Sequence, residues 1–201
     1  MLESVNQSVF QSLSAPCELS GGALLIALVL AQWAILAGPT LLVFLWVFGD
    51  PDERRAAVSA GLSALLALAV AATISSLYFH PRPFMDGLAH NYLQHGPDSS
   101  FPSDHATLLF ALGWSLALIP PSMLPRAWVV PMALAIAVGG SRVFLGAHYP
   151  LDIFGAAVVG FVSALCLTSA RCAWGVRTLT DLGIRFYDWP LSALRPDRDA
   201  R

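Results

Sequence analysis

Lysine is absent from this chain, and every cationic side chain is an arginine. Charged residues of either sign make up only 12% of the 201 residues, whereas hydrophobic residues make up 56%. An average soluble domain has roughly twice that share of charge, so the composition excludes an ordinary soluble protein and indicates a membrane protein. The net charge of −2 says little, because the placement of the charges matters more here than their sum.

Cysteine is scarce too, and the start of the chain lacks the pattern of a targeting signal. Cys17, Cys166 and Cys172 do not have the spacing of a metal site, so we interpret them as small buried or interfacial thiols. The first fourteen residues have neither a basic start nor a long apolar core, which predicts that no cleavable signal peptide is present.

Long apolar runs are abundant, and several could cross a bilayer, which takes about 20 residues of helix. Within a bilayer each backbone polar group needs an internal partner, so the runs are expected to be helices. We therefore predict an all-α, polytopic membrane helix bundle with five spans, folded as a single integral-membrane domain over residues 1–201. No charged residue occurs in 19–49, 56–79, 106–125 and 153–170, and a shorter run, 127–141, is the fifth span if it continues toward Leu145.

Polar turns and prolines set the expected limits of these spans. Pro39 should kink the first span, and residues 50–55 are interpreted as a tight polar turn before the second. The predicted spans cover residues 22–48, 56–79, 104–120, 127–145 and 150–171.

Both ends of the chain are expected to lie at membrane surfaces. Residues 1–20 carry apolar side chains at roughly helical spacing, which predicts an N-terminal interfacial helix. The tail, residues 171–201, carries six of the eleven arginines with aromatic and aliphatic residues between them. We expect it to be cytoplasmic, with its first part on the inner leaflet.

Arginine placement predicts which side of the membrane each loop faces. Arg54, Arg55 and Arg126 fall on the same side as the tail, and the positive-inside tendency makes this side cytoplasmic. The loop between the second and third spans and the loop between the last two then lie outside. Arg82 and Arg142 break the tendency, which makes them the better functional candidates.

Residues 141–152, Ser-Arg-Val-Phe-Leu-Gly-Ala-His-Tyr-Pro-Leu-Asp, join the end of one apolar run to the start of the next. Pro150 suits the first turn of a helix, which puts His148 just before that helix and Asp152 in its first turn. At this spacing the carboxylate can hold one ring nitrogen and leave the other free as a nucleophile or base. Arg142 offers a fixed fork for phosphate oxygens. The alternative is a surface loop with snorkelling polar residues.

Two further polar clusters lie on the same predicted side. Prolines flank Arg82 and favour an extended backbone there, although the arginine could also be a plain juxtamembrane anchor. Ser103 suits an N-cap, so the amides after it would form an anion site at a helix start, within reach of His105. The alternative is a capped helix with an interfacial histidine. Together the clusters suit phosphoryl transfer without a metal ion, and no cofactor is expected.

These residues resemble the motifs of a known family. The resemblance spans roughly residues 75–152 and implies a helical core like that of the vanadium haloperoxidases. The Ser-Asp-His form of the second motif is similar to that of bacterial undecaprenyl-diphosphate phosphatases of the bacitracin-resistance type. The three motifs of the type-2 phosphatidic-acid phosphatase superfamily are matched by Arg82-Pro83, by Pro102-Ser103-Asp104-His105, and by Ser141-Arg142 with His148 and Asp152.

The resemblance implies a multi-pass phosphatase of the bacterial inner membrane whose active site faces the periplasm or exterior. It would hydrolyse undecaprenyl diphosphate to undecaprenyl phosphate and inorganic phosphate, recycling the carrier lipid of peptidoglycan synthesis. His148 would become a phosphohistidine and Asp152 would orient it, while His105 would protonate the leaving oxygen and later activate water. The residues expected to bind substrate are Arg82, Arg142, Ser103, Asp104, Ser141 and His80.

One position departs from the family pattern. Many members carry a basic residue seven positions before the arginine of the Arg-Pro pair, and here that position is Ser75. The phosphate contact is either missing here or supplied by another residue, for which His80 is the candidate.

Other functions fit parts of the pattern. A phosphatase or phosphotransferase for another lipid, such as phosphatidylglycerophosphate or phosphatidic acid, would use the same chemistry. A transporter or channel with a histidine-lined mouth would need ionisable residues deep within the spans, and the apolar runs contain none. A non-catalytic lipid-binding protein would not need every motif histidine and aspartate.

Overall fold

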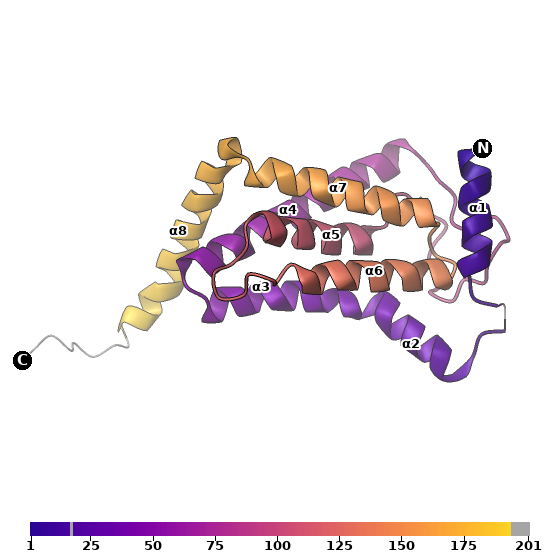
Figure 1. Ribbon diagram of the computed structural model, residues 1–201, viewed down its shortest axis with the longest axis horizontal. Helices are drawn as coiled ribbons and strands as arrows, with labels where there is room; N and C mark the ends of the chain where they lie inside the picture. The colour runs from indigo at the N-terminus through magenta and orange to yellow at the C-terminus, as the bar shows by residue number, and fades with distance from the viewer. Residues whose placement is uncertain (17, 194–201) are drawn as a thin grey trace, which may run out of the picture.

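The structure is a computed structural model that describes residues 1–16 and 18–193. In these residues it is all-helical with no strand (Figure 1), which confirms the predicted fold class. Cys17 and the end of the tail, 194–201, lie outside the described residues. The helices are α1 (Leu2–Leu13), α2 (Gly21–Gln32), the short 3₁₀ helix η1 (Ala34–Leu36), α3 (Ala37–Phe48), α4 (Pro51–Leu77), α5 (Asp104–Leu118), α6 (Val129–Phe144), α7 (Pro150–Thr168) and α8 (Ala170–Ala193).

Three helical segments of the described chain are long and apolar enough to cross a membrane. They are Gly21–Phe48, which runs through α2, η1 and α3, then Pro51–Leu77 and Pro150–Thr168. Helix α6 has 16 residues and α5 has 15, so each is shorter than a typical span. These segments indicate a multi-pass membrane protein, and the number of five crossings stays a prediction.

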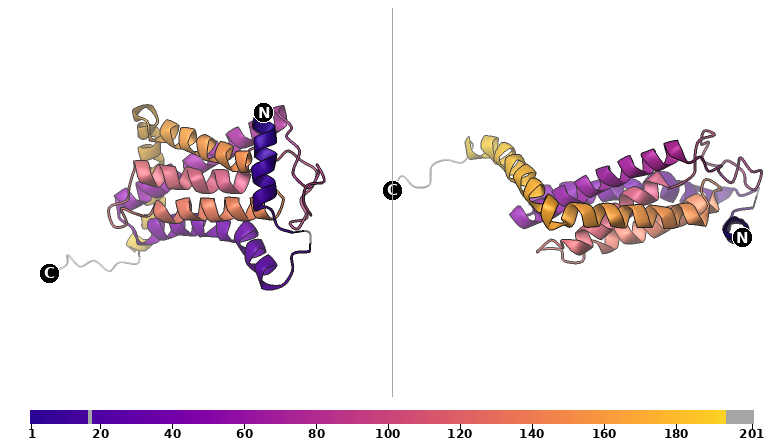
Figure 2. Two further views of the ribbon diagram at one scale, coloured as in Figure 1. Left: turned by 45° about the vertical axis from the view of Figure 1, so that its right-hand side comes forward. Right: turned by 90° about the horizontal axis from the view of Figure 1, so that it is seen from above.

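Helix α5 forms the centre of the bundle and packs against α4, α6 and α7 (Figure 2). It is buried on several sides, which is the pattern of a helix enclosed by protein rather than one facing lipid. On α4 the contact face consists of small residues, so the two backbones can approach closely. The buried alanines of that face are Ala56, Ala57, Ala60, Ala64 and Ala67.

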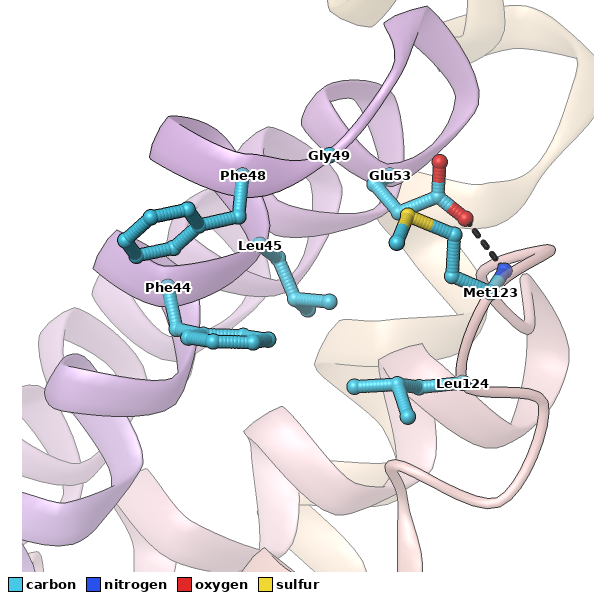
Figure 3. A pocket seen from close by; sticks show the side chains of 7 residues that line it. All are labelled: Phe44, Leu45, Phe48, Gly49, Glu53, Met123 and Leu124. Carbon is cyan, nitrogen blue, oxygen red and sulfur yellow. Dashed lines mark hydrogen bonds between the residues drawn. The ribbon is translucent and has the colours of Figure 1, made fainter.

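Helix α4 begins at Pro51, five residues before the predicted start, because residues 50–53 form a capping box. The side chain of Asp50 accepts from the backbone N–H of Glu53, and the Glu53 carboxylate accepts from the backbone N–H of Asp50. The other Glu53 oxygen accepts from the backbone N–H of Met123 at 2.6 Å (Figure 3). The predicted polar turn is therefore the anchored first turn of a helix.

The first span is interrupted just before Pro39 rather than at it. The chain forms a 3₁₀ helix over Ala34–Leu36 and resumes as α3 at Ala37. Proline clashes with the carbonyl four residues earlier and donates no hydrogen bond to it, so the distortion falls in the preceding turn.

The two ends of the bundle differ in character (Figures 1 and 2). The loop 78–103, the α6–α7 loop and α1 lie at one end, whereas α8 crosses the opposite end, near the α3–α4 turn. At the α8 end the guanidinium of Arg54 lies over the rings of Trp46 and Tyr187. The segregation matches the predicted sidedness of the loops, while the orientation in a membrane stays a prediction.

Gly160 marks a close approach of α7 to α5. A Cβ atom at this position would lie 2.8 Å from the backbone nitrogen of Ala111, so a side chain would force the helices apart. We expect Gly160→Val to lower the free energy of unfolding by about 1–3 kcal/mol, the usual cost of overpacking. The matched control is Gly140→Val on α6, where a Cβ would meet nothing within 4 Å. Thermal unfolding in detergent measures both, and equal midpoints would contradict this account of the packing.

Candidate active site

The three sequence clusters meet around one cavity of about 410 Å³ at the α1 end of the bundle. The cavity draws on the end of α4, the loop 78–103, the start of α5, the end of α6 and the α6–α7 loop. Five of the predicted site residues line it: Arg82, Asp104, His105, Arg142 and His148. The rest of the lining consists of Ala72, Ser75, Ser76, His95, Asp98, Ser99 and Pro102.

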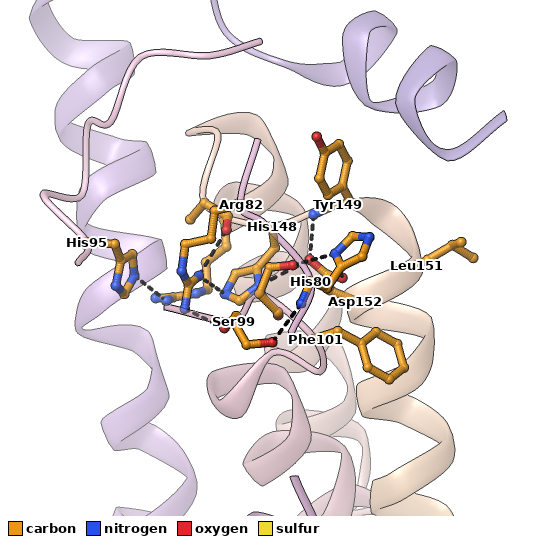
Figure 4. Close-up of polar contacts among 12 residues, drawn as sticks. His80, Arg82, His95, Ser99, Phe101, His148, Tyr149, Leu151 and Asp152 are labelled. Atoms are coloured by element: carbon orange, nitrogen blue, oxygen red, sulfur yellow. Dashed lines mark hydrogen bonds and ion pairs between the residues drawn. The ribbon is translucent and has the colours of Figure 1, made fainter. Parts of the chain in front are cut away.

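His148 and Asp152 lie together as their spacing predicts. Pro150 occupies the first turn of α7, and Asp152 Oδ2 accepts from the backbone N–H of Tyr149 at 2.7 Å, which closes that turn. The same oxygen lies 3.4 Å from Nδ1 of His148. A nearer partner of this nitrogen is the carbonyl oxygen of Ser100, at 2.9 Å. The imidazole is thus held at its Nδ1 atom by a carboxylate and a carbonyl (Figure 4).

The partners of His148 determine which ring nitrogen carries the proton. A carbonyl oxygen only accepts, so Nδ1 must donate to Ser100. The guanidinium of Arg82 only donates, and its Nη1 lies 3.3 Å from Nε2, so Nε2 carries the lone pair. Burial lowers the pKa of His148 to about 4; the adjacent carboxylate of Asp152 opposes this, and the charges of Arg142 and Arg82 add to it. At neutral pH the ring is therefore uncharged, with a nucleophilic nitrogen toward Arg82.

Arg82 is fixed by its own set of acceptors. Its Nε donates to the carboxylate of Asp98 at 2.7 Å, and Nη1 and Nη2 donate to the carbonyls of Ala147 and Ser99 at 3.0 and 3.2 Å. Burial would raise the pKa of Asp98, but the hydrogen bond and charge of Arg82 outweigh it and lower that pKa. Asp98 thus stays a carboxylate, although its side chain is largely exposed.

Arg142 has donor capacity that the protein does not use. Arg142 is only 3% exposed, and its Nη1 donates to the carbonyl of Ala31 at 3.0 Å. Nη2 lies 2.6 Å from Nε2 of His95, while Nε has no partner among the described residues. A buried cation with an unused donor is costly unless a ligand pairs with it, so this guanidinium is suited to an anion.

The N-terminus of α5 contributes backbone rather than side-chain donors. Ser103 precedes the helix as predicted, but its hydroxyl makes no capping hydrogen bond and has no described partner. Its backbone N–H instead donates to the carbonyl of Asp152 at 3.3 Å. The first amides of a helix lack intrahelical partners, so the start of α5 supplies a partial positive charge beside Asp104 and His105.

Three predicted substrate-binding residues lie outside the cavity lining. The Ser141 hydroxyl donates to the carbonyl of Val138 in its own helix, and Ser103 is fully buried beneath the start of α5. His80 lies beyond Asp152, with its Nδ1 2.7 Å from the Ser100 hydroxyl and 3.6 Å from Asp152 Oδ1 (Figure 4). His80 is therefore not among the residues that line the cavity, and its replacement of the basic residue missing at Ser75 stays a prediction.

Sequence reasoning did not select His95 and Asp98, which both line the cavity. The available signal was the clustering of polar residues in a long loop between two apolar runs. That signal identified the loop without indicating which of its side chains turn inward.

The described residues contain no group of three or more histidine, cysteine, aspartate or glutamate side chains that could hold a metal ion. The cavity instead offers arginine and backbone donors to an anionic group. The apolar helices and the anion-binding cavity fit a membrane phosphatase that acts on lipids. The chain belongs to the PAP2 superfamily, whose profile matches residues 56–174.

Comparisons with known proteins agree with this class. The chain is 34% identical to the undecaprenyl-diphosphatase YbjG of Escherichia coli, over 87% of this chain and 85% of that protein. It is 31% identical to undecaprenyl-diphosphatase BcrC of Bacillus subtilis, over 81% of each chain. The lipid A 1-phosphatase of Rhizobium etli is 38% identical over 51% of this chain and 41% of its own length. The crystal structure of Aquifex aeolicus LpxE shares the fold, with a TM-score of 0.61 at 20% identity, over 81% of this chain and 93% of LpxE.

The hydrogen bonds around His148 predict its protonation state. In ¹⁵N-histidine NMR spectra of the detergent-solubilised protein, His148 should be the Nδ1–H tautomer and should titrate near pH 4, protonating only below that value. Removing a cation with Arg82→Met should raise this midpoint, whereas removing the carboxylate with Asp152→Asn should lower it. Assignment comes from the signal lost in His148→Ala. An Nε2–H tautomer, or shifts of the same sign in both variants, would contradict the arrangement.

Proposed function

We propose that this protein is an undecaprenyl-diphosphate phosphatase that releases inorganic phosphate through a phosphohistidine at His148. The observation that carries the proposal is the lone pair on Nε2 of His148, beside the Arg82 guanidinium in a cavity that also contains Arg142. A neutral imidazole is a good nucleophile, and fixed guanidinium groups can stabilise the charge on the transferring phosphoryl oxygens.

The first chemical step forms a phosphorus–nitrogen bond at Nε2 of His148. The bond from phosphorus to the bridging oxygen breaks. His105, which would take up a proton when the anionic headgroup binds beside it, protonates that oxygen as the lipid monophosphate leaves. His148 keeps its Nδ1 proton and becomes cationic, and the buried carboxylate of Asp152 at 3.4 Å stabilises this charge. Arg142, which also lines the cavity, would donate to a phosphoryl oxygen.

The second step reverses the protonation roles. His105, now neutral, takes a proton from water, and the water oxygen attacks phosphorus while the phosphorus–nitrogen bond breaks. Inorganic phosphate leaves, and His148 returns to its neutral state with Nδ1 still donating to the Ser100 carbonyl. The sequence needs only side chains that line the cavity or lie directly behind it, so we propose that it requires no metal ion or cofactor.

The choice of substrate rests on relatives and on the leaving group. Two relatives matched over more than four fifths of their length carry the name undecaprenyl-diphosphatase. A lipid monophosphate is also a better leaving group than an alkoxide. Ala72 and Ser76, at the end of the apolar helix α4, border the cavity and are exposed. The prenyl chain would leave the cavity there, toward the bilayer.

We further propose that residues 1–201 act as one phosphatase domain in the bacterial inner membrane, with the cavity on the outer face. The support is the arginine distribution, since the α8 end carries Arg54, Arg55 and the arginines of α8 itself. A second candidate is a phosphatase for another lipid headgroup, favoured by the partial similarity to lipid A 1-phosphatase.

The substrate assignment predicts a ranking of phosphate release. Purified protein in detergent should release phosphate from undecaprenyl diphosphate faster than from undecaprenyl phosphate, phosphatidic acid or phosphatidylglycerophosphate, because the diphosphate has the better leaving group. His148→Ala serves as the blank for contaminating phosphatases. Equal turnover of the diphosphate and the monophosphate would reject this substrate while leaving the lipid phosphatase class intact.

The two histidines should differ in acid-quenched trapping with a ³²P-labelled activated substrate, whose leaving group needs no proton. Label should accumulate on His105→Ala, because loss of the general base slows hydrolysis of the phosphoenzyme, typically by about 10²–10⁴-fold. No label should appear on His148→Ala. In a separate test, the wild-type activity should persist in excess chelator, because the proposed reaction uses no metal ion. Wild-type turnover by His148→Ala would falsify the nucleophile assignment and leave direct attack by water.

A further inference from the structure

His95 is a side chain of the cavity that neither the family motifs nor the proposed chemistry uses. It comes from the loop 78–103, and its Nε2 lies 2.6 Å from Nη2 of Arg142. Its ring centroid is 6.4 Å from that of His148. Figure 4 shows His95 on the side of His148 that holds Arg82, away from His80. The ring therefore stands among the phosphate-binding candidates.

The loop holds His95 in place through its own backbone. The side chain of Asn91 accepts from the backbone N–H of His95 at 3.0 Å and donates to the His95 carbonyl at 2.9 Å. Gln94, just before it, has φ +53°, in the left-handed region that non-glycine residues seldom adopt. The strained backbone at Gln94 and the two hydrogen bonds from Asn91 together fix the backbone of His95.

The cavity lacks the basic residue that many family members carry at the position of Ser75. Ser75 lines the cavity, but its hydroxyl donates to the carbonyl of Phe101 at 2.9 Å. His80, the expected substitute, lies outside the lining. Of the histidines that do line it, His148 and His105 have roles in the proposed reaction, which leaves His95.

His95 is neutral while no anion is bound. Arginine only donates, so the short contact with Arg142 requires a lone pair on Nε2 of His95. Burial, followed by the charges of Arg142 and Arg82, lowers the pKa of His95 to about 4, and Asp98 partly opposes this. The titratable and charged groups that line the same cavity are Arg142 from α6, Asp104 and His105 from α5, His148 from the α6–α7 loop, and Arg82 and Asp98 from its own loop.

A bound phosphate would reverse this balance. Its oxygens would draw the Nη2 hydrogen of Arg142 away from His95 and would place negative charge beside the ring. Both changes favour the imidazolium form, since an adjacent anion raises the pKa of a histidine. A protonated His95 could then donate a charge-assisted hydrogen bond to the same phosphate.

We propose that His95 is a phosphate ligand of this protein and that it takes up one proton when the anionic headgroup binds. Arg142 transfers its Nη2 hydrogen bond from His95 to a phosphate oxygen, and Nε2 of His95 accepts a proton from solvent and donates it in a hydrogen bond to another oxygen. The inference rests on the proposed function of the cavity and adds to it a coupling between substrate binding and protonation.

The first test counts protons. Isothermal titration with inorganic phosphate at pH 6, in two buffers with different ionisation enthalpies, gives the number of protons taken up on binding. The wild type should take up close to one proton more than His95→Gln, whose side chain can accept from Arg142 but cannot become cationic. The control is His90→Gln in the same loop, whose ring packs on Tyr92 and does not line the cavity. It should match the wild type.

The second test uses kinetics with the lipid substrate. His95→Gln should raise KM roughly 10-fold and change kcat by less than about 3-fold, since the lost charge-assisted hydrogen bond serves binding. Adding Ser75→Lys to His95→Gln should lower KM most of the way back to the wild-type value, because it places a cation in the cavity. Should His95→Gln fail to fold, the number of protons taken up on phosphate binding is measured for His95→Ala instead.

Each outcome decides between the proposal and a structural role. Equal proton uptake by wild type and His95→Gln would overturn the proposal, even with a raised KM, because His95 would then only orient Arg142. Loss of uptake with rescue by Ser75→Lys supports it. A wild type that binds phosphate but hydrolyses none of the lipids tested would reject the proposed function and leave the result for His95 standing.

Discussion

The burial of one carboxylate, Asp152, is the constraint on which the site depends. With no exposed surface, it accepts from the Tyr149 backbone at the start of α7 and lies within 4 Å of Nδ1 of both His148 and His80. Its backbone carbonyl accepts from Ser103 at the start of α5. A buried charge is tolerated only when such partners surround it. One residue thus fixes two helix starts and the ring of the candidate nucleophile, so the fold and the site depend on the same contacts.

Local patterns in the sequence predicted the helical class, the start of α5 and the start of α7, because a long apolar run or a proline acts within a few residues. The helix boundaries that were predicted wrongly also have local causes. The Asp50–Glu53 capping box was treated as a turn, and the distortion caused by Pro39 lies in the turn before it. The enclosed position of α5 could not be predicted, since its composition matches that of a helix facing lipid.

The candidate site was predictable to the same degree. Spacing alone placed His148 beside Asp152, and family motifs located both arginines. The side chains that reach the cavity depend on contacts between distant segments, such as the 47 positions between His95 and Arg142. Short hydroxyl side chains illustrate the limit. Ser141 satisfies its hydrogen bond within α6, a local option that a sequence does not distinguish from binding a ligand.

The exposed small residues at the mouth of the cavity, Ala72 and Ser76, have a consequence for kinetics. They lie on a helix apolar enough to cross a bilayer, so under the proposed function a lipid headgroup would reach the cavity by lateral diffusion without leaving its leaflet. The concentration that governs the rate is therefore the mole fraction of substrate in the membrane surface. Diluting the substrate with inert lipid would slow the enzyme even at constant bulk concentration of substrate. The phosphate product has no lipid chain and would diffuse away into the water.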